Sequence, residues 1–214
     1  MTLAMPRLQR VPPDERGITI GDFLVPIQVW ERMGVRMRHL GLVVAGSLLI
    51  FLTALIAIPV PGSPVPVTGQ TFGVLLVGGA LGFRRGIAAT GLYVLLGAVG
   101  LPFFAEHKSG VEIILGTNGG YLLGFIVAGA LVGRLAELGW DRKLIGSVAA
   151  MLLGNAAIYV LGLPWLQAVT RESWTWTLDN GLWPYVIGDA LKLLLAAAVF
   201  PAAWWVVGRR PGDR

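Results

Sequence analysis

The chain has 214 residues, of which 55% are hydrophobic and only 14% are charged, whereas about a quarter of a soluble domain is charged. The long apolar stretches between His39 and Gly208 predict an integral membrane protein and exclude a separate soluble enzyme domain. With no Cys and only two His, disulfides, thiolate chemistry, metal sites and other cofactors are not expected. The net charge of +5 comes from basic residues that flank apolar stretches, so nucleic acid is not an expected partner.

The polar start of the chain, residues 1–36, does not resemble a signal peptide and predicts a cytoplasmic N-terminal arm. Within the arm, residues 20–35 mix apolar and charged side chains. Such a mixture is compatible with a helix lying in the membrane interface and equally with a disordered tail. A transmembrane domain is expected at 37–208, followed by a short cytoplasmic tail at 209–214.

Membrane spans follow from the lengths of the apolar segments, because a helix needs about 20 apolar residues to cross ~30 Å of hydrocarbon. One segment, 72–83, is too short to cross alone, but the Pro- and Gly-rich residues before it can extend it as an obliquely entering lead. We therefore expect an all-α bundle of six transmembrane helices. Besides 72–83, the predicted spans are 40–58, 86–101, 119–138, 144–161 and 185–207.

The basic residues indicate how the bundle is oriented. With six spans, all but three of the 17 Lys and Arg fall on one side of the membrane or in the two terminal segments. The exceptions are Lys108, Arg171 and Lys192. Since basic residues favour the cytoplasmic side, both termini are expected there. The count also supports the short span, because without it Arg84 and Arg85 would lie outside.

Glycine is unusually frequent, with 30 residues, or about twice the ordinary share. In lipid, small residues let helix backbones approach one another closely. Pairs of small residues four apart are expected to pack mainly within the monomer rather than against a partner. These pairs are Gly41 and Ala45, Gly120 and Gly124, and Gly129 and Gly133.

Two charged residues in the last span, Asp189 and Lys192, are the strongest functional signal. A charge inside the membrane costs several kcal/mol unless it is satisfied, so intramembrane charges usually mark a site. At a spacing of three the two side chains share one helix face, which also allows a purely structural ion pair. If Pro184 is the outer end of the helix, Asp189 lies about 8 Å inside it, a depth suited to a pocket that opens outward.

Other polar candidates lie at helix starts and inside one span. The span at 119–138 starts among four candidates, Thr117, Asn118, Gly119 and Tyr121. Free backbone amides at a helix start attract an anion or a carbonyl. Asn-Gly-Gly is, however, also an ordinary turn sequence. Gln70 and Thr71 end a Pro-rich loop at the membrane edge and can reach inward. Asn155 and Tyr159, one turn apart, are expected to face other helices, with ligand contact as the less favoured alternative.

Catalytic motifs are absent from the sequence. It contains no HExxH, no GxSxG and no GxxxxGK[ST] phosphate-binding loop. An enzyme is therefore not expected, and a P-loop ATPase is excluded. If the chain moves a solute uphill, the energy must come from an ion gradient or from another subunit.

Four ordered motifs resemble the BioY family, the biotin-binding S components of energy-coupling-factor (ECF) transporters. They are PVPVTGQT at 64–71, LGFRRG at 81–86, LGAVGLPFF at 96–104 and GGYLLGF at 119–125. The resemblance implies the ECF S-component bundle of six helices, with high-affinity biotin binding and uptake at the bacterial cytoplasmic (inner) membrane. It also implies biotin, an ECF transmembrane coupling subunit, ATPase subunits and the lipid bilayer as partners.

The resemblance further implies that Asp189, Lys192 and the loop around Asn118 contact biotin, although the family often has Thr at the position of Asn118. Gly119, Tyr121, Gln70, Thr117 and Asn155 complete the predicted binding set. S components commonly carry Ala-xxx-Ala in helix 1 as a contact for the coupling subunit; this chain lacks that pair. The alternatives are an S component for another vitamin and a stand-alone secondary transporter.

Overall fold

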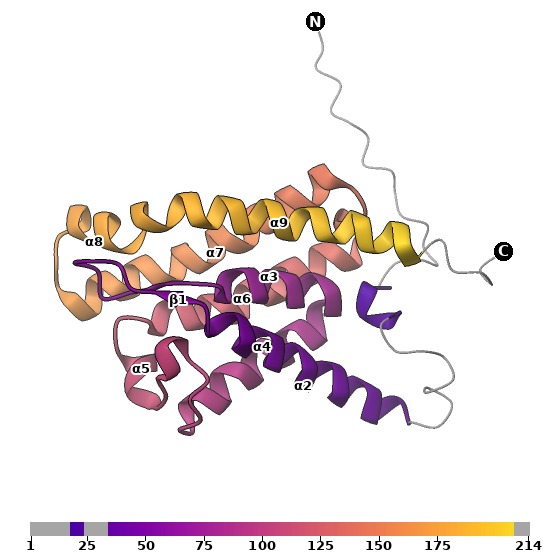
Figure 1. The fold of residues 1–214 in the computed structure, drawn as a ribbon, viewed down its shortest axis with the longest axis horizontal. Coiled ribbons are helices and arrows are strands. Elements are labelled where there is room, and N and C mark those ends of the chain that lie inside the picture. Colours follow the sequence, from indigo (N-terminus) through magenta and orange to yellow (C-terminus); the bar gives the residue numbers. More distant parts are fainter. Residues whose placement is uncertain (1–17, 24–33, 208–214) are drawn as a thin grey trace, which may run out of the picture.

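A computed structural model describes residues 18–23 and 34–207. Within these residues, six helices of 12 residues or more form a bundle (Figure 1). They are α2 (Val35–Ala54), α3 (Gln70–Leu81), α4 (Phe83–Ala98), α6 (Gly119–Glu137), α7 (Leu144–Thr170) and α9 (Trp183–Val207). The shorter elements are η2 (Ile20–Asp22), β1 (Ala57–Ile58), β2 (Val67–Thr68), η3 (Ala105–His107), α5 (Val111–Leu115), η4 (Trp140–Arg142) and α8 (Trp174–Gly181).

Four candidate spans in the described chain are long and apolar enough to cross a membrane: 36–54 in α2, α6, α7, and 174–207, which joins α8 to α9. Helix α3 is apolar but has only 12 residues. Large apolar side chains also cover the outside of the bundle; on α9, Ile187 is 77% exposed and Leu191 is 65% exposed. Such an exterior fits lipid and not water. The protein is therefore a multi-pass membrane protein, and the predicted all-helical bundle is confirmed.

Several predicted span boundaries differ from the helices, and the ends of two spans show why. The first span ends at Ala54 instead of residue 58, and the chain continues into β1, which pairs antiparallel with β2. Four prolines between the two strands favour extended backbone over helix. The span predicted at 144–161 continues through Pro164 to Thr170. Pro164 lacks the N–H for one backbone hydrogen bond. The helix nevertheless continues on both sides of it.

The bundle has two distinct ends (Figure 1). At one, which we call the hairpin end, lie β1, β2, α5 and α8. At the other, which we call the arginine end, lie the start of α4 with Arg84 and Arg85, and the last turn of α6 with Arg134. Arg84, Arg85 and Arg134 thus lie at the same end of the bundle, as the count of basic residues predicts.

Glycines let α6 pack closely at the centre of the bundle. A Cβ added to Gly78 of α3 would lie 2.8 Å from the Gly129 carbonyl oxygen, and one on Gly124 would lie 2.8 Å from the Ile158 Cα of α7. The predicted pairs at 120/124 and 129/133 therefore pack within the chain. Gly41 is different, because a Cβ added there would have no described atom within 4 Å apart from its chain neighbours and its own helix backbone.

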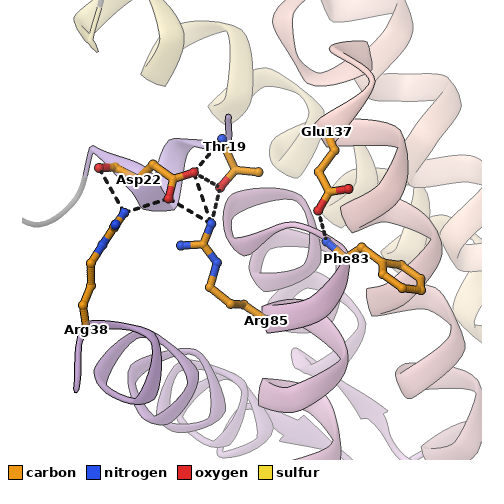
Figure 2. Close-up of polar contacts among 6 residues, drawn as sticks. All are labelled: Thr19, Asp22, Arg38, Phe83, Arg85 and Glu137. Carbon is orange, nitrogen blue, oxygen red and sulfur yellow. Dashed lines mark hydrogen bonds and ion pairs between the residues drawn. The ribbon is translucent and has the colours of Figure 1, made fainter. Parts of the chain in front are cut away.

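Residues 18–23 pack against the arginine end, and Asp22 connects them to two helices (Figure 2). Its Oδ1 accepts from Arg38 of α2 at 2.7 Å and from Arg85 of α4 at 2.9 Å. Burial alone raises the pKa of Asp22, but the Thr19 amide donor and the Arg85 guanidinium outweigh burial and hold the pKa below its ordinary value. Beside this cluster, the Glu137 carboxylate accepts from the first amide of α4, that of Phe83, at 2.9 Å.

A second carboxylate near this end, that of Asp141 in η4, is only 1% exposed. Its Oδ2 accepts from the Trp204 indole of α9 at 2.7 Å, while the Arg142 guanidinium lies 4.6 Å from the Trp204 ring centroid. Burial raises the pKa of Asp141 to about 6, against the smaller opposing effects of these two neighbours. The Asp141–Trp204 contact ties the end of α9 to the α6–α7 connection.

Only part of the predicted arm can be compared with the structure. Residues 20–22 form a single 3-10 turn, and most of the segment considered for an interfacial helix, 24–33, lies outside the described residues. Most of the remaining arm, 1–17 and 24–33, and the predicted tail, 209–214, lie outside the described residues.

Candidate functional site

A cavity lies at the hairpin end and encloses about 700 Å³, part of which is open to solvent. Its walls come from the β1–β2 hairpin and the start of α3, the segment around η3, and helices α6, α7 and α9. The lining residues are Val65, Pro66, Thr68, Gln70, Thr71, Phe104, Ala105, Glu106, Lys108, Ile113, Asn118, Tyr121, Leu122, Phe125, Ile158, Tyr159, Gly181, Tyr185, Asp189 and Lys192.

Asp189 and Lys192 form an ion pair in the cavity wall, with Nζ 3.0 Å from Oδ1. The same carboxylate accepts from the Tyr159 hydroxyl at 2.5 Å and from the Thr71 hydroxyl at 3.3 Å. The Lys192 ammonium also donates to the Thr68 carbonyl at 2.6 Å. Asp189 is only 5% exposed, and its three donors offset the cost of burying its charge.

The hairpin supplies a second polar wall, built around the buried amide of Gln70. Its Nε2 donates to the Tyr93 hydroxyl, and its Oε1 accepts from the Thr68 hydroxyl at 2.9 Å. The pairing of β1 with β2 brings Thr68 to the face of Lys192, although the two residues are 124 positions apart. The Pro-rich loop is thus part of the cavity wall, and Gln70 and Thr71 at its end line the cavity.

The middle of the cavity is apolar and aromatic. Leu122, Phe125 and Ile158 line it. The rings of Tyr121 and Tyr159 meet edge to face with centroids 6.2 Å apart. The Tyr121 hydroxyl donates to the Gly181 carbonyl at 3.0 Å, so this ring is held in place and offers the cavity its apolar surface.

Asn118 lines the cavity at the N-cap of α6, and its side chain makes no capping hydrogen bond. Within the described residues that side-chain amide has no partner, so both its donors and its acceptor remain available. Gly119 does not line the cavity; a Cβ there would lie 1.7 Å from the Ile114 carbonyl oxygen. Its role is to let α5 approach the start of α6.

The loop between α4 and α5 forms one rim of the cavity and carries a second ion pair, Glu106 with Lys108, at 2.5 Å. Glu106 and His107 both have φ of 59°, a region that non-glycine residues seldom occupy. Phe104 anchors the loop: it is 2% exposed, and its ring fills the space beside Gly97, where a Cβ would approach to 2.3 Å.

Five of the eight predicted site residues line one cavity, namely Asp189, Lys192, Asn118, Tyr121 and Gln70. Thr117, Gly119 and Asn155 do not line it. Asn155 lies one helical turn from Tyr159, and its buried Oδ1 has no hydrogen-bond partner among residues 18–23 and 34–207.

Several residues that line the cavity are missing from the binding set predicted from the sequence. Of these residues, Tyr159 could most readily have been predicted. A Tyr four residues from Asn155 in an apolar span is a polar signal that the sequence shows. Tyr185 had no such signal, since an aromatic residue near a helix start also fits a membrane interface. In the sequence, Glu106 and Lys108 look like ordinary charged residues of a loop.

The charges on the cavity wall balance, with two carboxylates and two ammonium groups. Polar groups together with apolar surface can orient a small molecule that has both polar and apolar parts. The arrangement therefore suits the binding of such a molecule.

The bundle has the fold of a transporter substrate-binding component. Over 84% of this chain and 96% of the other, it superimposes with a TM-score of 0.73 and 24% identity on the crystal structure of the S-component for biotin from an ECF-type ABC transporter. The sequence model of the BioY family matches residues 28–209. The chain belongs to the BioY family, whose members are transporter components and not enzymes.

Named relatives agree with this assignment. The chain is 38% identical over 142 residues to the biotin transporter BioY of Thermotoga maritima, covering 66% of this chain and 82% of that protein. It is 34% identical over 161 residues to the biotin transporter BioY2 of Lactococcus lactis subsp. cremoris, covering 75% and 86% of the two chains.

Proposed function

We propose that this chain binds biotin with high affinity in the cavity at the hairpin end and serves its uptake as the substrate-specific component of an ECF-type transporter. The observation that carries the proposal is the Asp189–Lys192 pair, embedded in a wall shared by β2, α3, α7 and α9. Biotin has a ureido ring with two N–H donors and one carbonyl, an apolar sulfur ring and chain, and a carboxylate.

The chemistry of the wall is complementary to these groups. The Asp189 carboxylate can accept from the ureido N–H groups, and the third donor of the Lys192 ammonium can reach the ureido carbonyl. Leu122, Phe125 and Ile158 supply apolar surface for the sulfur ring and chain. The unpartnered amide of Asn118 provides a further donor and acceptor.

Binding is tested by equilibrium dialysis of the purified chain in detergent with labelled biotin, without ATP or other subunits. Saturable binding that excess unlabelled biotin abolishes, and that thiamine and riboflavin do not, supports the proposal. Displacement by thiamine or riboflavin instead would reassign the cavity to another vitamin. A folded, monodisperse sample with no saturable binding of any of the three contradicts the function.

The proposed partners are a transmembrane coupling subunit and two ATPases, because the chain has no phosphate-binding loop of its own. Helix α2 is the proposed contact for the coupling subunit. It lacks Ala-xxx-Ala, but Gly41 and Ala45 are exposed on it and let another helix approach closely. Co-expression with these subunits should allow purification of a complex, and Gly41→Leu should weaken its assembly without changing biotin binding.

Both termini and the arginine end are proposed to face the cytoplasm, with the hairpin end outside, because most basic residues then obey the positive-inside tendency. The absence of Cys makes the test direct. A single Cys at position 108 should react with a membrane-impermeant maleimide in intact cells, and one at position 84 should react only after lysis. Labelling of position 84 in intact cells would reverse the proposed orientation.

A further inference from the structure

A second cleft lies at the arginine end, and residues of α2, α4 and α6 line it. Among the residues that the structure describes, its wall carries three arginines, one histidine and one carboxylate. The basic residues are His39 of α2, Arg84 and Arg85 of α4, and Arg134 of α6. The other lining residues are apolar, so the cleft joins positive charge to apolar surface at one end of a membrane-spanning bundle.

Two of these arginines keep donors that no described group uses. The Arg85 guanidinium donates through Nη2 to the Asp22 carboxylate at 2.9 Å (Figure 2). Its Nη1 is buried and has no hydrogen-bond partner among residues 18–23 and 34–207. Arg84 is exposed, and within the same residues it takes part in no hydrogen bond or ion pair. Because a buried donor without a partner is costly, Nη1 of Arg85 points to an acceptor that the described chain does not supply.

The carboxylate of the wall already has partners. One oxygen of Glu137 pairs with the Arg134 guanidinium at 3.0 Å, and the other accepts from the Phe83 amide at 2.9 Å. Glu137 therefore leaves Arg84 and Nη1 of Arg85 available to another anion. Planar guanidinium groups match the oxygens of a phosphate well, because several N–H donors can bind it at once.

The apolar part of the cleft distinguishes a lipid from a soluble phosphate. Val43, Phe83 and Ala88 line the cleft beside the arginines. Next to it on α2, the apolar surface continues outward through Val44 and Leu48, which are both exposed. A free phosphate makes no use of such surface, whereas a phospholipid places its acyl chains along it. Basic pockets between transmembrane helices are known to bind anionic lipid headgroups.

We propose that this cleft binds the headgroup of an anionic phospholipid, with the phosphate on Arg84 and Arg85 and the acyl chains against α2 and α4. The lipid would then add a second link between these two helices, which Asp22 already connects through Arg38 and Arg85. The cleft and the biotin cavity lie at opposite ends of the bundle (Figure 1). The proposal therefore stands or fails independently of the proposed function.

The test measures the melting temperature of the full chain in detergent micelles that contain increasing mole fractions of phosphatidylglycerol. A ligand that binds only the folded state raises the melting temperature, and the mole fraction at half-saturation reports the affinity. Two other probes are compared: phosphatidylcholine, which has a phosphate but no net charge, and inorganic phosphate at matched ionic strength.

Two variants and a control locate the site. Arg84→Gln removes the guanidinium that has no partner in the described chain, and Ala88→Leu narrows the cleft without changing its charge. Arg36→Gln is the matched control, because it removes the same charge from an exposed residue of α2 that does not line the cleft.

Phosphatidylglycerol should raise the melting temperature of the wild type in a saturable way, and the other two probes should not. Arg84→Gln should raise the half-saturating mole fraction about threefold to tenfold, as expected for a partly screened charge-assisted hydrogen bond. Ala88→Leu should shift it in the same direction, and Arg36→Gln should leave it unchanged. Biotin affinity should be the same in all three variants.

The proposal is overturned if phosphatidylglycerol gives no saturable shift, or if phosphatidylcholine gives an equal one. A matching shift with inorganic phosphate would make the cleft a site for soluble anions instead. Equal weakening in Arg36→Gln and Arg84→Gln would show only a general attraction of this end for anionic micelles. If Arg84→Gln does not fold, an unchanged half-saturation in Ala88→Leu decides against the cleft.

Discussion

The role of Asp189 and Lys192 is open to a decisive perturbation, the double variant Asp189→Asn with Lys192→Met. Removing one charge alone leaves the other buried without its partner, which typically costs about 3–5 kcal/mol of folding stability. Removing both avoids this penalty. The Tyr159 and Thr71 hydroxyls donate to different oxygens of the carboxylate, at 2.5 and 3.3 Å. In the variant one of them can donate to the amide oxygen and the other can accept from the amide N–H. The Thr68 carbonyl loses the Lys192 donor at a cost of about 1–3 kcal/mol.

The double variant should therefore still fold, whereas its affinity for biotin should fall strongly. If each charged group forms a charge-assisted hydrogen bond to biotin, each is worth about 1.5–3 kcal/mol, or roughly tenfold to a hundredfold in affinity at about 1.4 kcal/mol per decade. We expect the double variant to bind biotin at least about a hundredfold more weakly.

Calorimetric titration with biotin checks this, after gel filtration and a thermal melt have shown that the variant is monodisperse and folded. Asp179→Asn makes the same chemical change at an exposed residue outside the cavity lining and should bind as the wild type does. Near-normal affinity in the folded double variant would refute the reasoning. The pair would then be structural, and the polar contacts would have to come from Asn118 and the hairpin wall.

Three further predictions concern stability, measured by thermal melts in detergent. Asp22→Asn should destabilise the protein at pH 7. Since the pKa of Asp22 is lowered in the folded state, the melting temperatures of wild type and variant should converge as the pH falls below about 4. A difference that stays constant with pH would count against a stabilising role of the Asp22 carboxylate. Asp141→Asn should abolish a gain in wild-type stability between about pH 6 and pH 4, because the raised pKa makes the folded state bind the proton first. Gly78→Val should cost about 1–3 kcal/mol by overpacking against Gly129, whereas an equal loss in Gly41→Val would show that close packing is not the cause.

Much of the architecture could be predicted from local sequence. The lengths of the apolar segments indicated the bundle, and the positions of Arg84 and Arg85 supported the short helix that became α3 and its neighbour α4. The spacing of Asp189 and Lys192 predicted a shared face because an α-helix brings residues three apart together. These features depend on segment length, charge position and helical periodicity, each of which a single segment carries by itself.

Other features depend on contacts between distant segments. The hydrogen bond from the Lys192 ammonium to the Thr68 carbonyl could not be predicted from the sequence. It requires the β1–β2 hairpin to fold back toward α9. It also could not choose between Asn155 and Tyr159 on the same helix. In a bundle surrounded by lipid, both the inner and outer helix faces are apolar, so no amphipathic pattern marks which face turns inward.

The sequence by itself thus determined that the chain crosses the membrane as helices and that two charges lie together inside the last one. Only the tertiary structure decided which polar side chains share a cavity, because rotation of each helix about its axis is determined by glycine contacts such as that of Gly78 with Gly129. The approach of the Glu106–Lys108 loop to the cavity likewise depends on Phe104 filling the space beside Gly97, and packing of this kind leaves no periodic signal in the sequence.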